Sequence, residues 1–270
     1  VEEISLEDVR RIFPQVQTGD LAAAGYERDS GYGEPLSVTG GFAQRARELG
    51  AEIRLGTRLI GIEITGGRVR TAITDKGEIE TGAIVNAAGP WAGEVGGMAG
   101  IDLPLKLLRH QVFIFTPPFT PASSGTDLGS IYFRPEGPKQ FLIGGGEDEE
   151  AEDPERYARG TDVHTLEEVG KQGIARFQGF EEAEFFKGWS GLFTVTPDWH
   201  PILGETEVEG FYLAVGFSGH GFKLSPMVGR CLAELIVDGR AKTVDVSSLR
   251  LSRFAAGKHL TSRYKLNLLA

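Results

Sequence analysis

The stretch "VGFSGHGFKLSP" (residues 215–226) places three glycines, a histidine and a lysine between a predicted strand and a predicted helix. A glycine-lined turn that leads into a helix exposes main-chain N–H groups and the positive end of the helix dipole. Glycine has no side chain, so a flat ring can approach such a turn closely. The stretch therefore indicates a site for a delocalised, electron-rich ligand. The alternative is a tight turn with solvated His220 and Lys223.

Two nucleotide-binding motifs do not fit this stretch. A P-loop requires GxxxxGK[ST]; Gly216 and Gly221 have the right spacing, but Phe222 stands where the lysine is needed. The dinucleotide motif GxGxxG is met at Gly219 and Gly221, but Leu224 replaces the third glycine. No other window of the sequence completes this motif. The 270 residues therefore contain no predicted pyrophosphate loop.

Hydrophobic periodicity and turn residues predict helices and strands along the whole chain. Apolar residues at helical spacing, with caps at both ends, predict the helices, and short β-branched runs bounded by glycine predict the strands. Ser5 is the predicted N-cap of the first helix; Ser225 is that of the last, followed by Pro226. The predicted helices cover 5–14, 37–49, 162–177 and 225–238, and the predicted strands include 51–55, 58–64, 68–74, 78–81, 83–89, 111–116, 131–133, 140–144 and 211–217.

Composition restricts the class of protein. With 270 residues and 40% hydrophobic content, the chain can bury one large core or two joined cores. A formal net charge of −10 disfavours nucleic-acid and anionic-membrane partners. The one cysteine, Cys231, excludes an internal disulfide, and no apolar run approaches the roughly 18 residues of a membrane span. We therefore predict a cytoplasmic protein with small-molecule partners and no metal, and interpret the acidic run 147–155 as a solvated loop.

Three separated blocks resemble the flavin-dependent amine and amino-acid oxidoreductases, a family that includes sarcosine oxidase, dimethylglycine dehydrogenase, glycine oxidase and D-amino-acid oxidase. The blocks are "VNAAGPWAGEV" (85–95), "TPDWHPILGE" (196–205) and "GFSGHGFKLSPMVG" (216–229). The third block is most similar to the sarcosine oxidase and dimethylglycine dehydrogenase branch. The resemblance implies an α+β (α/β) fold, in which part of a Rossmann-like FAD-binding domain is interleaved with a substrate domain. The substrate domain would have a mixed or antiparallel β-sheet flanked by helices.

The resemblance also implies a domain organisation. Residues 36–91 and 205–245 would form the C-terminal part of the FAD-binding domain, 1–35 and 92–204 the substrate domain, and 246–270 a tail. Family members begin with a βαβ unit whose GxGxxG motif holds the FAD diphosphate, roughly a hundred residues that this sequence lacks. We therefore expect the C-terminal two thirds of such an enzyme, inactive alone.

Family motifs imply roles for individual positions. The implied flavin-binding residues are Leu59, Ala87, Ala88, Gly89, Trp91, Gly219, His220, Gly221 and Phe222. The main-chain N–H groups of the last four would face the pyrimidine edge of the flavin, where reduction adds negative charge. Lys223 would hold the substrate carboxylate, with Arg134 as a second cation and Tyr132 facing the substrate. Three alternatives stay open: Leu59 as a plain core residue, His220 as a structural residue rather than an electrostatic tuner of the flavin, and Arg134 as a surface residue.

The function implied by the resemblance is oxidation of the C–N bond of a small N-methylated amino acid, such as sarcosine or dimethylglycine, by hydride transfer to FAD. FAD would be noncovalent, because Gly191 lies near the place where monomeric sarcosine oxidases carry a flavin-linked cysteine. Oxygen or another carrier would reoxidise it, and the number of subunits is left open. The alternatives are an enzyme of the same fold acting on a 2-hydroxy acid or a glycerol phosphate, and a flavin-free binding module.

Overall fold

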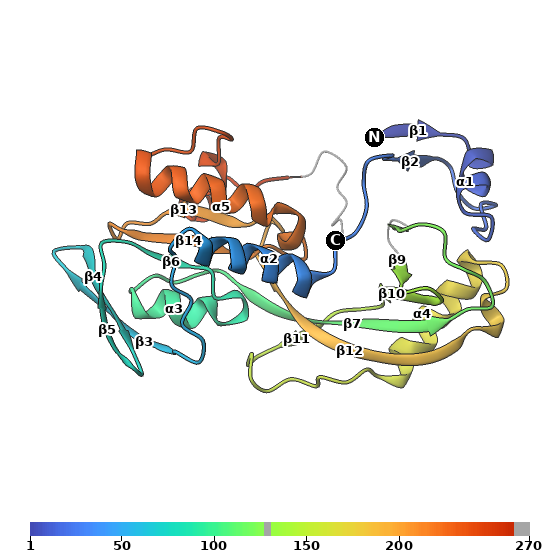
Figure 1. The fold of residues 1–270 in the computed structure, drawn as a ribbon, viewed down its shortest axis with the longest axis horizontal. Coiled ribbons are helices and arrows are strands. Elements are labelled where there is room, and N and C mark those ends of the chain that lie inside the picture. Colours follow the sequence, from blue (N-terminus) through green and yellow to red (C-terminus); the bar gives the residue numbers. More distant parts are fainter. Residues whose placement is uncertain (127–130, 262–270) are drawn as a thin grey trace. The chain divides into compact units, whose positions relative to one another are not determined.

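The chain divides into two compact units, each described here by itself. The computed structural model describes residues 1–126 and 131–261, and Figure 1 labels its elements. The first unit comprises Val1–Glu34, Arg109–Glu149 and Arg156–Gly191; the second comprises Pro35–Leu108, Glu150–Glu155 and Leu192–Ala270. Segments 92–108 and 192–204 thus pack within the second unit. The assignment of either unit to flavin or to substrate stays a prediction.

The first unit is built on an antiparallel sheet. Its central strands are β7 (Lys106–Thr116), β10 (Gln140–Gly145) and β9 (Ile131–Glu136). With the short strands β11 (Glu149–Ala151) and β8 (Gly125–Thr126), the order is β11-β7-β10-β9-β8, and β12 (Glu184–Val195) also pairs with β7. The strands predicted at 111–116, 131–133 and 140–144 are confirmed. Side chains alternate between the two faces of a strand, so Phe133 and Tyr132 face opposite sides.

One face of this sheet packs on a cluster of phenylalanines. α4 (Val163–Arg176) covers it, confirming the helix predicted over 162–177. Phe177 is fully buried, and its ring centroid lies 4.9 Å from those of both Phe133 and Phe141, in edge-to-face contact. Burying one phenylalanine side chain completely stabilises the folded state by about 1.5–3 kcal/mol relative to leaving it exposed. The buried members of the cluster are Phe13, Phe113, Phe115, Ile131, Phe141, Ile143, Val169, Phe177 and Phe180.

The first helix of the chain is capped as its sequence predicts. α1 (Leu6–Ile12) begins after Ser5, whose hydroxyl accepts from the Asp8 N–H at 3.1 Å. The Asp8 carboxylate in turn accepts from the Ser5 N–H at 3.3 Å, which completes a capping box. Ahead of the helix, β1 (Glu2–Ile4) pairs with β2 (Ala24–Tyr26) in an antiparallel ladder.

The second unit contains two small sheets. In one, β14 (Phe211–Val215) lies between β13 (Ile202–Glu205), which is antiparallel to it, and β6 (Ile84–Asn86), which is parallel. The other is the meander β3 (Leu59–Thr65), β4 (Arg68–Thr74) and β5 (Gly77–Glu80). The remaining short elements of the chain are η1 (Gly89–Trp91), α3 (Ala92–Met98), η2 (Phe180–Glu182), η3 (Ser247–Leu249) and α6 (Ser252–Ala255).

The last long helix begins earlier than its sequence suggests. α5 (Gly221–Asp238) starts four residues before Ser225, so the predicted N-cap at Ser225 and first-turn position of Pro226 are wrong. Pro226 has no N–H for the Phe222 carbonyl, and the Ser225 hydroxyl donates to that oxygen instead, at 2.9 Å. This bond lets the helix extend back through the proline to Gly221. Gly239 ends the helix with φ of +72°, as predicted.

Two predicted features of the second unit differ in the structure. Residues 51–55, predicted as a strand, belong to no sheet and are exposed. α2 (Pro35–Glu48) occurs where a helix is predicted over 37–49, but it has no buried residue. Phe42 and Leu49, two of the apolar residues at helical spacing that predict this helix, are 57% and 71% exposed. The helical pattern is thus present without a covering surface among the described residues.

Candidate functional site

Two turns of the second unit lie side by side at one edge of its sheet. β6 and β14 run parallel, with Leu213 opposite Asn86, so the turns that follow them leave the sheet in the same direction. One turn contains residues 87–89 and the other contains residues 216–220. In parallel sheets, ligands bind beyond the carboxyl ends of the strands. The structure therefore brings together two predicted flavin-binding segments that are distant in the sequence.

The turn after β6 is held by a buried asparagine. Asn86 is 1% exposed; its Nδ2 donates to the Ala92 carbonyl at 2.9 Å, and its Oδ1 accepts from the Ala88 N–H at 3.2 Å. Gly89 has φ of +54°, and a Cβ there would meet no atom within 4 Å. The turn thus leaves open space at Gly89. The sequence analysis missed Asn86, although it is a lone amide in an otherwise apolar run.

The turn after β14 is packed closely against the rest of the second unit. Gly216 has φ of +67°, and a Cβ there would lie 2.5 Å from the Thr196 side chain. At Gly221, a Cβ would lie 3.1 Å from the Phe217 Cβ. Packing within the protein therefore leaves no room for a side chain at Gly216 and little room at Gly221. At Gly219, φ is +85°, a conformation that favours glycine.

The main-chain N–H groups of the turn are not all available to a ligand. The His220 N–H donates to the Phe217 carbonyl at 2.8 Å, within the turn itself. The N–H groups of the first turn of α5, at Gly221, Phe222 and Lys223, have no intrahelical acceptors by the geometry of a helix start. A ligand at this edge of the sheet would therefore meet those three donors rather than the His220 N–H.

Lys223 occupies a position that helix stability does not explain. It is exposed and is the third residue of α5, close to the positive end of the helix dipole, where a cation is unfavourable. Within the described part of the chain, Lys223 makes no hydrogen bond or ion pair, whereas Arg230, two turns later, pairs with Glu234 at 3.2 Å. Lys223 is therefore a candidate partner for an anionic group bound at the helix start.

The other predicted flavin contacts have varied surroundings. Leu59 begins β3, opposite Thr74, in the separate meander sheet. Trp91 is 37% exposed, and its indole Nε1 donates to the Glu155 carboxylate at 3.0 Å. Phe222, on the first turn of α5, is 47% exposed. The roles of these three residues stay predictions.

In the first unit, Tyr132 and Arg134 share the sheet face that is opposite the phenylalanine cluster. They are two residues apart on β9, and Phe133 between them points into the cluster. The Arg134 guanidinium forms an ion pair with Glu136 at 2.5 Å and lies 5.3 Å from the ring centroid of Tyr32. These contacts account for Arg134 without a ligand, and its role as a substrate cation stays a prediction.

Tyr132 belongs to a buried chain of hydrogen-bonding groups. His110, on β7, is 4% exposed; its Nε2 lies 3.0 Å from the Tyr132 hydroxyl and its Nδ1 lies 2.7 Å from the Asp148 carboxylate. In the tautomer whose Nδ1–H donates to the carboxylate, Nε2 accepts the tyrosine O–H. A side chain at Gly144 would overlap the Tyr132 ring. Sequence analysis missed His110 and Asp148 because their spacing shows no pattern.

The pKa of Tyr132 is raised above the usual value for a tyrosine. Burial raises the pKa of Tyr132 from 10.0 to about 12, and the Asp148 carboxylate acts in the same direction. Because the folded-state pKa is the higher one, stability from the neutral hydroxyl is complete below pH 10.0 and is lost as the pH rises through about 12. Ultraviolet titration of tyrosinate should show one late step. Tyr132→Phe should remove that step, and loss of an early step instead would contradict the assignment.

The acidic run 147–155 is more than a solvated loop. Glu149 forms an ion pair with Arg109 at 2.9 Å, and Asp162 pairs with the same guanidinium at 2.6 Å. Arg109 is 4% exposed and also donates to the Ala158 and Gly160 carbonyls. The interpretation as a solvated loop is wrong for Asp148, whose side chain is 12% exposed and contacts buried His110, whereas the Glu149 side chain is 64% exposed despite its ion pair with Arg109. Among the described residues, no group of acidic, histidine or cysteine side chains could hold a metal ion.

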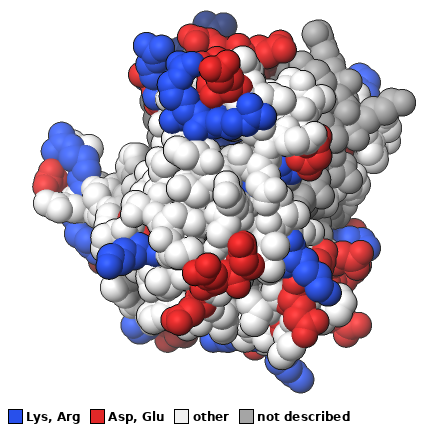
Figure 2. All heavy atoms as spheres, turned by 90° about the vertical axis from the view of Figure 1, so that its right-hand side faces the viewer, with Lys and Arg blue, Asp and Glu red and all other residues white. Residues whose placement is uncertain are grey.

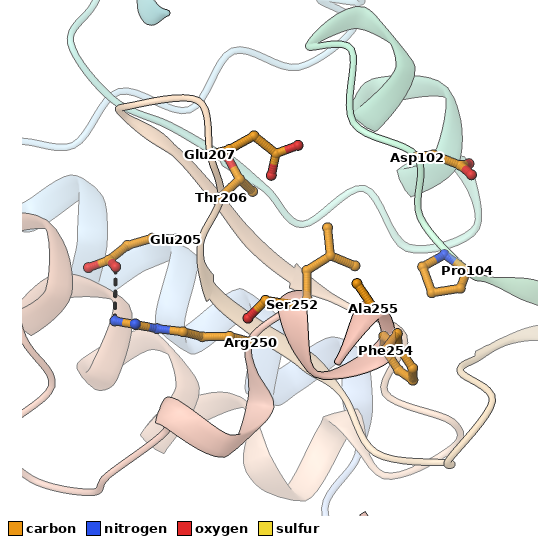
Figure 3. A pocket seen from close by; sticks show the side chains of 10 residues that line it. Asp102, Pro104, Glu205, Thr206, Glu207, Arg250, Ser252, Phe254 and Ala255 are labelled. Atoms are coloured by element: carbon orange, nitrogen blue, oxygen red, sulfur yellow. Dashed lines mark hydrogen bonds and ion pairs between the residues drawn. The ribbon is translucent and has the colours of Figure 1, made fainter. Parts of the chain in front are cut away.

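A cavity of about 540 Å³ in the second unit does not contain the predicted site residues (Figure 3). Its lining includes Asp102, Glu205 and Glu207, and the Arg250 guanidinium pairs with Glu205 at 2.9 Å.

The face drawn in Figure 2 carries both basic and acidic side chains around a broad uncharged area. None of the helices in the described part of the chain has the length and apolar character needed to cross a membrane.

The sequence of this chain is similar to those of known FAD-dependent oxidoreductases. The family model described as "FAD dependent oxidoreductase" (DAO) matches residues 1–235. FAD-dependent oxidoreductase domain-containing protein 1 of Bos taurus is 26% identical over 94% of this chain and 60% of that protein. Sarcosine oxidase subunit beta of Rhodobacter capsulatus is 26% identical over 83% of this chain and 53% of that protein.

The structural comparison agrees with the sequence comparison. The crystal structure of L-proline dehydrogenase from P. horikoshii has a TM-score of 0.88 and 28% identity, covering 96% of this chain and 70% of that one. The mixed α/β fold predicted from the sequence is thereby confirmed. The chain spans less than two thirds of the length of the two curated relatives. Because the family match takes in most of its residues, the chain belongs to the DAO family of FAD-dependent oxidoreductases, whose cofactor is FAD.

Proposed function

We propose that the whole protein oxidises the C–N bond of a small N-methylated amino acid, such as sarcosine or dimethylglycine. The observation that carries the proposal is the pair of small-residue turns at the carboxyl ends of β6 and β14, with Lys223 beside them. Relatives named sarcosine oxidase subunit beta and sarcosine dehydrogenase support the substrate class.

The residues of these turns fit a flavin. Open space at Gly89 and the N–H groups at the start of α5 suit a flat ring with an electron-rich edge. Ala87, Ala88 and Gly89 would hold one side of it, and Gly219, Gly221 and Phe222 would hold the pyrimidine edge. FAD supplies the two-electron acceptor when it is bound. The preorganised N–H groups and the helix dipole would then stabilise the added negative charge.

Lys223 would orient the substrate through a charge-assisted hydrogen bond to its carboxylate. Positioning of this kind accounts for much of the rate increase in reactions that need no protein nucleophile. In the first unit, Tyr132 would face the substrate and Arg134 would be a second cation for its carboxylate. The Tyr132 hydroxyl is held to His110 Nε2 at 3.0 Å, which gives that phenol proton a defined acceptor.

The surface around β6 supports a further part of the proposal. A GxGxxG unit is absent from the 270 residues. β6 is the edge strand of its sheet, and among the described residues no strand pairs with its outer side. Val85 of this strand is 36% exposed. Parallel strands are ordinarily covered on both faces and flanked by neighbours. We therefore propose that a dinucleotide-binding βαβ unit pairs with β6 to complete the FAD site.

A substrate panel tests the proposal on the full-length protein. The protein is loaded with FAD, made anaerobic and mixed with sarcosine, dimethylglycine, L-proline, glycine, lactate or glycerol 3-phosphate, while the flavin absorbance is followed. We expect bleaching by N-methylated amino acids. Bleaching by lactate or glycerol 3-phosphate alone would contradict the substrate class, and no flavin bands after FAD addition would favour a flavin-free module.

L-Proline is a second candidate substrate. The structure of L-proline dehydrogenase from P. horikoshii has a TM-score of 0.88 to this chain. Proline and sarcosine both carry a carboxylate next to a secondary amine, so the same Lys223 contact would serve either. Faster anaerobic bleaching by L-proline than by sarcosine would assign the enzyme to the cyclic amino acid.

A further inference from the structure

A buried ion pair ties the C-terminal segment to the "TPDWHP" block. Arg253 and Asp198 are 4% and 1% exposed, and their side chains form two bonds, Nε to Oδ2 at 2.8 Å and Nη2 to Oδ1 at 2.9 Å. Arg253 also donates to the His200 and Leu249 carbonyls, each at 2.7 Å. Its guanidinium is therefore fully occupied by partners within the second unit, as a buried charge requires.

The pair connects to the glycine turn through two residues. The single proton of the Thr196 hydroxyl is shared between two acceptors, the His200 carbonyl at 2.7 Å and Asp198 Oδ1 at 3.2 Å. The Thr196 main-chain N–H donates to the Ser218 hydroxyl at 3.3 Å, and the Ser218 N–H donates to the Thr194 carbonyl at 3.0 Å. Ser218 immediately precedes Gly219. A continuous set of bonds thus runs from Arg253 to the turn that leads into α5.

Backbone strain is concentrated in the same network. In the described residues, Trp199 and Ser218 are the two non-glycine positions with positive φ, at 59° and 50°. Such conformations persist only when surrounding contacts enforce them, and they gather at functional sites. Trp199 follows Asp198, and Ser218 is 1% exposed within the glycine turn. Ser218 therefore has a strained conformation at the point where the network bonds to the glycine turn.

We infer that Arg253 is a positioning residue for the glycine turn, acting through Asp198, Thr196 and Ser218. The inference rests on the proposed function, since the turn matters most if it binds flavin. Arg253 lies beyond the family match, which ends at residue 235, so the match itself gives it no role. The C-terminal segment thereby sets the direction of the N–H groups that would face the ligand at the start of α5.

Hydrogen exchange tests this role without any flavin. Thr196→Val removes the hydroxyl contacts to Asp198 and to the His200 carbonyl, and that carbonyl keeps its bond from Arg253, so we expect the variant to fold. We expect the Ser218 and His220 amides to exchange about tenfold faster in Thr196→Val, and faster still in Arg253→Lys. Matched controls are Thr206→Val and Arg250→Lys, which alter a threonine turn and an exposed pair outside the network; these should leave both amides unchanged.

Two exchange results would overturn the inference. One is unchanged exchange across residues 216–222 in both network variants. The other is an equal acceleration at the core amide of Leu213, on β14, because this would show a general loss of stability rather than positioning.

Flavin binding by the full-length protein provides the second readout. We expect Thr196→Val to raise the FAD dissociation constant about tenfold and to alter the visible flavin spectrum, with Thr206→Val behaving as the wild type. An unaltered spectrum and affinity in both network variants would contradict the inference. A wild-type protein that takes up no FAD contradicts the proposed function instead, while the exchange experiment still decides the positioning role.

Discussion

Replacing Asp198 with asparagine is expected to lower the free energy of unfolding by about 3–5 kcal/mol, because it leaves the buried Arg253 guanidinium without a negative partner. Asparagine has nearly the same shape, so the loss reflects charge rather than packing. Burial opposes ionisation of Asp198, but hydrogen bonds from Arg253 and from the Leu260 and His200 N–H groups outweigh it and hold the pKa of Asp198 below 3.8. Stability from the pair is therefore present above that pH and lost as the pH falls below it. Urea unfolding followed by circular dichroism measures the change.

A matched exposed pair provides the control for this prediction. Glu205 and Arg250 are bonded at 2.9 Å in the same unit, but their side chains are 38% and 46% exposed. Glu205→Gln should cost at most about 1 kcal/mol, because water screens and replaces the contact. Equal, small losses in Asp198→Asn and Glu205→Gln would show that the buried pair adds little to stability.

Lys223→Ala is expected to raise the KM for the amino-acid substrate of the full-length enzyme by about 10- to 100-fold, the range of a charged hydrogen bond. FAD affinity should change much less, because the predicted flavin contacts at this turn are main-chain groups. Steady-state kinetics and FAD titration of the same preparation separate the two effects. The exposed side chain leaves no buried partner unpaired when it is removed, so the fold should be retained.

Two variants make this result specific. Lys223→Arg keeps a cation at the position and should recover most of the affinity for substrate. Arg230→Ala removes a charge from a later turn of α5, where the pair with Glu234 is an ordinary surface contact, and should leave KM unchanged. An unchanged KM in Lys223→Ala would remove the carboxylate role from this residue and leave it as a solvated lysine.

Local patterns predicted most of the individual elements. The capping box at Ser5 and Asp8 is visible in the sequence because both bonds join residues three positions apart. The β-rich runs of the first unit became strands because their phenylalanines alternate toward one covered face. The predicted start of α5 was wrong because the capping pattern does not show a side-chain bond inside the helix. The Ser225 hydroxyl donates to the Phe222 carbonyl in place of the N–H that Pro226 lacks, and α5 extends back to Gly221.

The candidate site was predictable in part. The resemblance identified the glycine turn and the residues after β6, and parallel pairing of β6 with β14 then placed them at one sheet edge. Gly221 was interpreted as room for a ligand, yet a Cβ there would lie only 3.1 Å from the Phe217 Cβ. Distinguishing these two uses of a glycine requires the positions of residues that are not its neighbours in the sequence.

Composition, periodicity and short motifs were sufficient to predict the main helices and strands and the resemblance to the family, because these signals are local. Only the tertiary structure decided which distant side chains meet. His110 joins Tyr132 and Asp148, and Arg253 reaches Asp198, through pairings with no common spacing. The physical reason is that burying a charged or polar group requires a partner, and any residue that the fold brings within hydrogen-bond distance can provide it.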